Sequence, residues 1–82
     1  MKLGNQLRRC RFENGDISQD SLAKAIGVTR QTIISIEKGH FVPSTLLTLK
    51  LARYFDKPVE EIFHIIDDDA MDARGESPEL RR

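Results

Sequence analysis

Apolar residues recur at helical spacing along most of this chain of 82 residues. Leu3, Leu7 and Cys10 follow one another at intervals of four and three, the stripe of an amphipathic helix. A first helix is therefore predicted over residues 2–13. It is ended by the Asn-Gly-Asp turn at residues 14–16, since such a sequence favours a tight turn.

Four further helices are predicted from capping residues and apolar stripes. Ser18, Thr29 and Ser44 have the residue type that caps a helix N-terminus, and Gly27 and Gly39 have the type that ends a helix. The expected helices cover residues 19–26, 30–38, 45–55 and a short stretch from Pro58 to about residue 63. The helix, glycine turn and helix across residues 19–38 form a helix-turn-helix layout. The fold class is predicted as all-α, a bundle of five helices.

The end of the chain differs from the rest. Residues 63–66 (Phe-His-Ile-Ile) are rich in β-branched side chains and precede three aspartates, so they could form a strand that pairs with a twofold mate. The alternative is that Ile65 and Ile66 cover the monomer's own core. Residues 1–66 are predicted to be the domain, and residues 67–82 an acidic and mobile tail.

The predicted helix at residues 30–38 has an unusual outward side. It presents Arg30, Gln31, Ile34, Ser35 and Lys38, with Thr32 on its flank, and no carboxylate. Arginine and glutamine match the donor and acceptor edges of guanine and adenine, hydroxyls adapt to any base, and an apolar side chain can contact a thymine methyl. The alternative is an ordinary polar face that keeps the domain soluble.

Composition and charge narrow the function classes. Hydrophobic residues make up 39% and charged residues 32%, as in a soluble domain, and no stretch is long and apolar enough to span a membrane or to serve as a signal peptide. A cytoplasmic protein is expected, and the single cysteine excludes an internal disulfide. Residues 1–57 hold ten Lys and Arg against five Asp and Glu, whereas residues 58–82 hold three against eight. A basic body favours nucleic-acid binding.

Catalysis is not expected. His40 and His64 lie far apart in the sequence, and no Cys/His cluster has metal-ligand spacing. The aspartates at 67–69 are interpreted as a solvated acidic patch, and Cys10 as a small core residue. The sequence therefore predicts no catalytic residue, no metal and no cofactor.

A resemblance to a known family strengthens this interpretation. Residues 17–39 read ISQDSLAKAIGVTRQTIISIEKG, which resembles the core signature of the lambda-repressor-like (XRE-type) helix-turn-helix family. Residues 42–55 and 58–63 look like the fourth and fifth helices of the same family. The resemblance covers roughly residues 2–66. It implies a five-helix DNA-binding domain, usually a dimer on a palindromic operator and most often a repressor.

The resemblance also implies roles for single residues. The positions that would meet base edges are Arg30, Gln31, Thr32 and Ser35, and Ile34 joins them where the family more often has a polar residue. Thr29, Lys38 and Gln19 match positions that contact phosphate, with Gln19 also bracing the reading helix. Ser18 is added because its hydroxyl and the free N–H groups beside it stand at a helix start. Arg11 and Glu37 match a pair that ties the first helix to the end of the third.

The leading hypothesis is a sequence-specific regulator of transcription that binds double-stranded DNA, most simply as a repressor. The main alternative is an antitoxin-type module that binds a protein partner as well as its own operator, and a restriction-modification controller is a variant of the leading hypothesis. A homodimer is expected because one helix reads too few base pairs to be selective in a genome. The apolar residues left over for its interface are Leu46, Leu49, Tyr54, Ile65 and Ile66.

Overall fold

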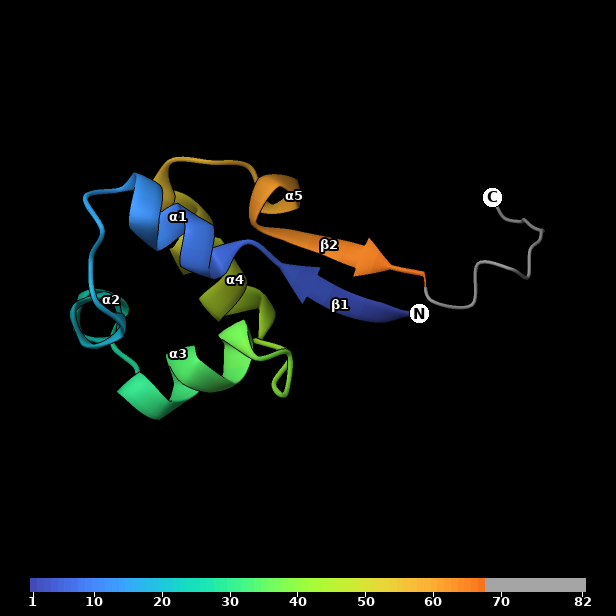
Figure 1. The fold of residues 1–82 in the computed structure, drawn as a ribbon, viewed down its shortest axis with the longest axis horizontal. Helices are drawn as coiled ribbons and strands as arrows, with labels where there is room; N and C mark the ends of the chain where they lie inside the picture. The colour runs from blue at the N-terminus through green and yellow to red at the C-terminus, as the bar shows by residue number, and fades with distance from the viewer. Residues whose placement is uncertain (68–82) are drawn as a thin grey trace.

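The computed structural model describes residues 1–67, which form five helices and one two-stranded antiparallel sheet. In chain order the elements are β1 (Lys2–Asn5), α1 (Leu7–Glu13), α2 (Gln19–Ile26), α3 (Arg30–Glu37), α4 (Thr45–Phe55), α5 (Val59–Ile62) and β2 (Phe63–Ile66). The helices gather into one body, and the two strands extend from it as an arm (Figure 1). The acidic tail predicted for residues 67–82 lies, beyond Asp67, outside the described residues.

The core lies where the apolar stripes of the helices meet. The second, third and fourth predicted helices are confirmed, and their inward positions supply most of the buried side chains. The buried apolar residues are Leu7, Cys10, Leu22, Ala23, Ile26, Ile33, Ile36, Leu47, Leu51, Phe55, Ile62 and Phe63. Burying a Leu, Ile or Phe side chain stabilises a fold by about 1.5–3 kcal/mol. The longest helix, α4, has 11 residues, and no helix in residues 1–67 is both long and apolar enough to cross a membrane.

Hydroxyl caps fix where α2, α3 and α4 begin. In each case the side-chain oxygen of the capping residue accepts a hydrogen bond from the backbone N–H three residues later. The three contacts are Ser18 with Ser21 (3.0 Å), Thr29 with Thr32 (3.2 Å) and Ser44 with Leu47 (3.1 Å). Each cap of this kind stabilises a helix by about 0.5–2 kcal/mol. The start of α2 and the start of α3 could therefore be predicted from the residues next to them.

The prediction of a first helix over residues 2–13 is wrong at its N-terminal end. Lys2–Asn5 is strand β1, and α1 begins only at Leu7. Leu3 does stand four residues before Leu7, but Gly4 disfavours a helix by about 1 kcal/mol relative to alanine. The Asn5 side chain accepts a hydrogen bond from the Leu7 N–H at 3.1 Å, which starts the helix at that point.

The sheet makes the fold class not strictly all-α. Residues 63–66 do form a strand, but β2 pairs with β1 of its own chain, with Leu3 opposite Ile65 and Gly4 opposite His64. A Cβ at position 4 would lie 2.6 Å from the His64 ring and 2.5 Å from the end of the Ile66 side chain, so these two side chains would have to move if Gly4 were replaced. Ile65 and Ile66 do not cover the monomer's core, since 66% and 39% of these residues' surfaces stay exposed.

Cys10 supplies a prediction about pH. The residue is buried on α1, and that burial raises the pKa of its thiol, although the positive charge of Lys57 partly lowers it. Above pH 9, where a thiol of ordinary pKa has ionised, the folded chain therefore holds a proton that the unfolded chain has lost, and stability must fall as the pH rises. We expect the free energy of unfolding to fall more steeply above this pH in the wild type than in Cys10→Ala. Urea titrations at a series of alkaline pH values measure this, and parallel curves would contradict the burial of a neutral thiol.

Candidate nucleic-acid interface

The two sides of α3 have opposite chemistry. Ile33 and Ile36 are buried against the core, while Arg30, Gln31 and the following residue Lys38 are exposed. Thr32, Ile34 and Ser35 lie between these extremes and are half-buried. Every position that the sequence assigned to base contact is therefore at least partly accessible to a partner.

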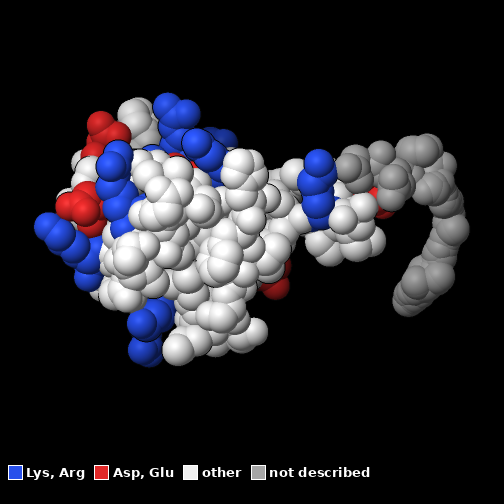
Figure 2. Space-filling view, turned by 90° about the horizontal axis from the view of Figure 1, so that it is seen from below, with Lys and Arg blue, Asp and Glu red and all other residues white. Residues whose placement is uncertain are grey.

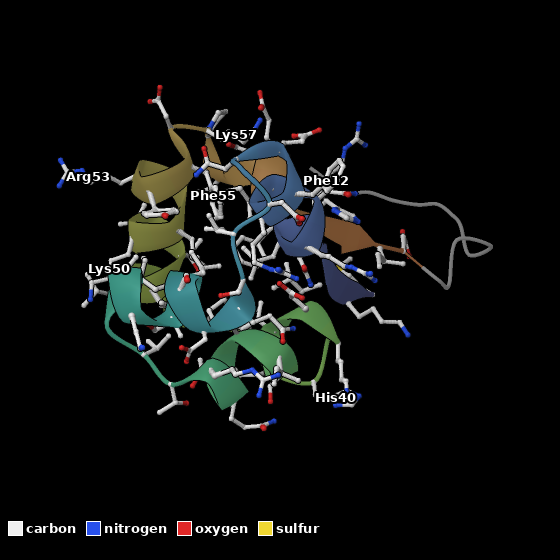
Figure 3. All side chains as sticks on the ribbon, turned by 60° about the vertical axis from the view of Figure 1, so that its left-hand side comes forward. Phe12, His40, Lys50, Arg53, Phe55 and Lys57 are labelled. Atoms are coloured by element: carbon white, nitrogen blue, oxygen red, sulfur yellow. The ribbon has the colours of Figure 1, made fainter. Side chains whose placement is uncertain are left out.

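The turn before α3 sets how that helix stands on the body. Gly27 has a φ of +78°, a left-handed conformation that glycine adopts without strain, and it ends α2. The ammonium of Lys50 on α4 donates a hydrogen bond to the Ile26 carbonyl at 3.1 Å and so satisfies the end of α2 (Figure 3). Sequence reasoning missed this role of Lys50, because nothing local to α4 signals a partner 24 residues earlier. The turn is thus fixed by the backbone conformation of Gly27 and by the hydrogen bond from Lys50.

The polar groups on the outer side of α3 differ in how firmly they are engaged. The Thr29 and Thr32 hydroxyls lie 3.0 Å apart, in the cap that begins the helix. The Gln31 amide donates to the Ser35 hydroxyl at 3.4 Å, a long and weak contact. Within residues 1–67 the Arg30 side chain has no hydrogen-bond or ion-pair partner, so Arg30 and Gln31 are the groups most readily available to an external acceptor or donor.

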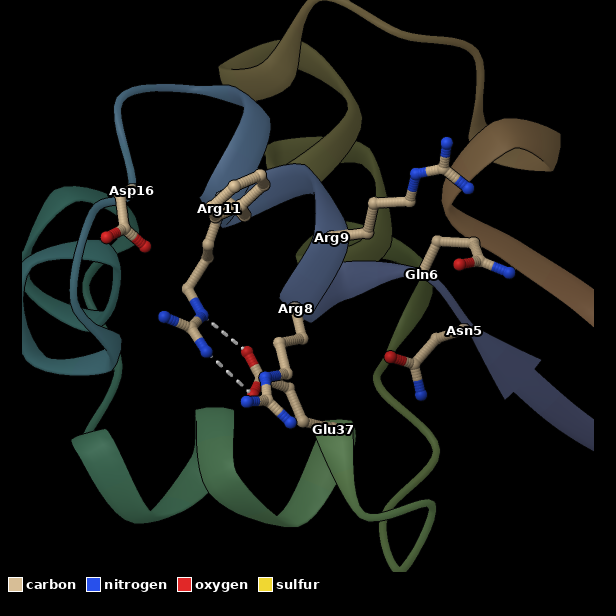
Figure 4. Close-up of a pocket in the computed structure, with 8 residues that line it drawn as sticks. Asn5, Gln6, Arg8, Arg9, Arg11, Asp16 and Glu37 are labelled. Atoms are coloured by element: carbon tan, nitrogen blue, oxygen red, sulfur yellow. Dashed lines mark hydrogen bonds and ion pairs between the residues drawn. The ribbon is translucent and has the colours of Figure 1, made fainter.

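Glu37 holds the C-terminal end of α3 against the rest of the domain. Its carboxylate accepts hydrogen bonds from Arg11 Nε at 2.6 Å and Arg11 Nη2 at 3.1 Å, a two-point contact shown by the dashed lines in Figure 4. Gln19 Nε2 donates to the same carboxylate at 3.1 Å. Only 12% of the Arg11 side chain and 9% of the Glu37 side chain are exposed. The structure therefore joins α1, the start of α2 and α3 at one carboxylate that is mostly shielded from solvent.

Two further hydrogen bonds extend this connection. The second Arg11 Nη donates to the Ile17 carbonyl at 2.8 Å, which secures the turn between α1 and α2. Asn5 Nδ2 donates to the Ile36 carbonyl at 2.9 Å, so β1 also contacts the end of α3. Sequence reasoning missed Asn5, since residue 5 was assigned to a helix whose outward positions give no sign of this contact.

An open hollow of about 560 Å³ lies along α3, between that helix and the N-terminal parts of α1 and α2, and we call it the α3 hollow. It brings together residues that the sequence assigned to base and to phosphate contact, namely Ser18, Gln19, Arg30, Ile34 and Lys38. In Figure 2, which views the molecule from the side of α3, the centre of this face is free of charge, and Lys and Arg side chains stand at its margin together with some Asp and Glu side chains. Of the assigned phosphate contacts, Ser18 and Thr29 also use their hydroxyls as caps.

The apolar residues assigned to a dimer interface are accessible but not in one place. Leu46, Leu49 and Tyr54 are exposed on α4, and Ile65 and Ile66 are exposed on β2. The Tyr54 ring also meets the Phe55 ring edge-on at 5.1 Å between centroids. Sequence reasoning missed four more exposed apolar side chains, namely Met1, Phe12, Phe41 and Val42. Of these, Met1, Phe41 and Val42 line a second hollow with Leu3 and Phe63 of the sheet.

Comparison with known families decides what this arrangement is. The model of the helix-turn-helix family matches residues 7–62, more than half of the chain. The chain belongs to the lambda-repressor-like (XRE-type) helix-turn-helix family. The members of this family are DNA-binding regulators of transcription.

Relatives of the helix-turn-helix domain occur in archaea and bacteria. The chain is 48% identical over 54 residues to an HTH-type transcriptional regulator of Methanocaldococcus jannaschii, covering 66% of this chain and 82% of the relative. It is 44% identical over 59 residues to the HTH-type transcriptional regulator YgzD of Bacillus subtilis, covering 72% and 88%. A third relative, the cryptic phage CTXphi transcriptional repressor RstR of Vibrio cholerae, is 33% identical over 58 residues, covering 71% and 51%.

The helix-turn-helix match identifies the structural unit that carries the candidate interface. The matched residues begin with α1 and end with α5, so they contain α3, the α3 hollow and the Glu37 contacts, and they leave out both strands. In residues 1–67 no group of three or more His, Cys, Asp or Glu side chains is placed to hold a metal ion.

Proposed function

We propose that this chain is a sequence-specific repressor that binds double-stranded DNA as a homodimer and reads the major groove with α3. The observation that carries the proposal is the outer side of α3, which offers two forked side chains, hydroxyls and one apolar side chain without any carboxylate. An α-helix fits the major groove, where all four base pairs present distinct donor and acceptor patterns. A carboxylate on this side would repel phosphate, and the one acid of α3, Glu37, is paired with Arg11.

Rigid support of α3 favours reading of sequence over loose attachment to any duplex. The helix is held at its N-terminal end by the Gly27 turn and at its C-terminal end by Arg11, Gln19 and Asn5. Side chains on a fixed helix meet base edges in one register, which direct readout requires.

Selection of bound duplexes from a random pool tests sequence-specific reading. We expect enrichment of one short motif that is repeated as a palindrome with half-sites about one helical turn apart, which would place the two copies of α3 about 34 Å apart. Enrichment by an Arg53→Ala variant is the control, because Arg53 lies on α4 away from α3 (Figure 3). A pool that remains random after repeated rounds with the wild type would refute the proposal.

Repression, rather than activation, is supported by the name of the phage relative RstR, a transcriptional repressor. The test is a reporter gene whose promoter overlaps the selected motif. Expression should fall when the wild type is supplied and should not fall when the motif is scrambled. An increase in expression would identify an activator.

A homodimer is supported by the free edge of the sheet. Gln6 N–H donates to the Ile62 carbonyl at 2.7 Å, so by the alternation of an antiparallel ladder Gly4 also exchanges bonds with His64. The N–H and carbonyl of Ile65 then point to the outer edge of β2, beside an exposed side chain. A second copy related by a twofold axis at Ile65 would continue the sheet as β1-β2-β2-β1.

This arrangement predicts that Ile65→Asp is monomeric. The residue is exposed, so the charge should leave the single chain folded, whereas two aspartates facing each other across the axis would repel. Sedimentation at micromolar concentration should give a dimer for the wild type and a monomer for Ile65→Asp. Phe12→Asp is the matched control, since Phe12 on α1 is equally exposed and should leave the dimer intact. A wild type that sediments as a monomer when free, and that binds one palindromic site as a monomer, would refute the dimer.

The antitoxin alternative gains no support from the relatives described above, whose names give transcriptional regulators and a repressor. No observation in residues 1–67 favours a partner protein of another kind over a second copy.

A further inference from the structure

The charges along the α3 hollow do not balance. Five charged side chains other than Arg11 line it, namely Arg8, Asp20, Arg30, Glu37 and Lys38. The Glu37 carboxylate is already occupied by Arg11 and Gln19. Asp20 pairs with Lys24 at 3.3 Å, on the exposed surface of α2.

Three cations in this hollow are therefore uncompensated. Arg8, Arg30 and Lys38 make no ion pair and no side-chain hydrogen bond within residues 1–67. They come from three places, namely the first turn of α1, the first turn of α3 and the residue after α3. Like charges that face one hollow repel each other, and a bound anion relieves that repulsion.

Arg8 is distinguished from its neighbours on α1 by its position. It lines the α3 hollow and also an adjoining hollow of about 530 Å³, in which Asn5, Gln6 and Phe12 take part. Figure 4 shows Arg8 extending from α1 toward the C-terminal end of α3, near Glu37. Arg9, the next residue, instead pairs with Glu13 at 3.0 Å, and Arg11 forms an ion pair with Glu37. Arg8 is thus the α1 arginine with a free guanidinium beside the candidate interface.

We propose that Arg8 contacts a phosphate of the DNA backbone while α3 lies in the major groove, so that the interface extends onto α1. The inference rests on the proposed function, because it takes its partner from the duplex that α3 reads. Arginine is suited to this role, since its fork can donate two hydrogen bonds to one phosphate. Such a contact fixes position and adds affinity, but it carries no sequence information.

Salt dependence of binding separates this contact from a structural effect. Each phosphate neutralised contributes about 0.9 to the slope of log K against log salt concentration. Arg8→Ala should lower the magnitude of that slope by about 0.9 and leave the preferred motif unchanged. The advantage of the wild type over the variant should shrink by about 3.5-fold between 50 and 200 mM salt. Arg8→Lys should restore most of the slope because it restores the charge.

Arg53→Ala is the matched control, since it removes the same charge from α4 and should leave the slope as in the wild type. An unchanged slope in Arg8→Ala, or an equal change in Arg53→Ala, would overturn the assignment. Saturable binding of inorganic phosphate in the hollow at submillimolar concentration would also overturn it, by identifying a small-anion site in place of a backbone contact. If the wild type binds duplexes without any preferred motif yet Arg8→Ala still lowers the slope, the contact stands and sequence-specific repression fails.

Discussion

Glu37→Ala is expected to lower the free energy of unfolding by about 3 kcal/mol, near the lower end of the cost of breaking a buried ion pair, because the Arg11–Glu37 pair is only mostly shielded from solvent. The substitution leaves the mostly shielded Arg11 guanidinium without its carboxylate and frees the Gln19 amide. It also removes the side-chain hydrogen bonds between α1 and the end of α3. In a domain of this size each kcal/mol shifts the melting temperature by about 4–8 °C, so the loss should exceed 10 °C. Thermal unfolding followed by circular dichroism measures it.

Glu13→Ala is the matched control for this prediction. Glu13 is also a glutamate paired with an arginine, but 72% of the Arg9 side chain and 44% of the Glu13 side chain are exposed. Exposed pairs contribute about 1 kcal/mol or less. A double-mutant cycle between Arg11→Ala and Glu37→Ala should give a large coupling energy. Additive effects of the two substitutions would show that the pair does not hold α3 in place.

Arg30→Ala and Gln31→Ala are expected to weaken binding to the selected motif and to relax the preference at one base pair each. The Arg30 side chain has no partner within residues 1–67, and Gln31 is held only by a 3.4 Å contact to Ser35. Neither side chain therefore gives up a strong internal bond on binding. A bidentate contact to a base discriminates by about 1–3 kcal/mol, which corresponds to about a 5- to 150-fold change in affinity.

Titrations against duplexes that differ at single base pairs measure both effects. Lys38→Ala is the matched control, because a phosphate contact should weaken all duplexes alike and reduce the salt slope. Melting temperatures should stay near that of the wild type, since both residues are exposed. If Arg30→Ala and Gln31→Ala both retain the wild-type motif and affinity, α3 is not the reading element.

The parts of the fold that could be predicted are those specified by nearby residues. Ser18, Thr29 and Ser44 cap helices because a hydroxyl can reach a backbone N–H three residues away, and Gly27 ends a helix by its own backbone freedom. The exposed apolar side chains of α4 could also be predicted from the sequence, because α4 carries more apolar residues than the one stripe that packs against the core. The position of α3 and its outward side followed from these signals.

The arm could not be predicted because its two strands are about 60 residues apart in the sequence. Leu3 stands at helical spacing from Leu7, and no residue near Leu3 indicates that it pairs with Ile65. The same limit applies to the contacts of Asn5 and Lys50 with backbone carbonyls, which depend on how the helices come together. Arg11 and Glu37 are 26 residues apart. The helix dipole disfavours Glu37 near the end of α3 and so indicates that it has a partner, but only the family resemblance named Arg11.

The pairing of β1 with β2 has a consequence for the order of events during synthesis. β1 leaves the ribosome before α1 to α5, and β2 follows all five helices. Contacts that close so long a stretch of chain form late, whereas helices and their neighbours pack early. The helices that pack around α3 can thus assemble on a growing chain before Leu3 pairs with Ile65. Only a chain synthesised through Ile66 can close the arm, so self-association through β2 would be restricted to chains that already contain all five helices.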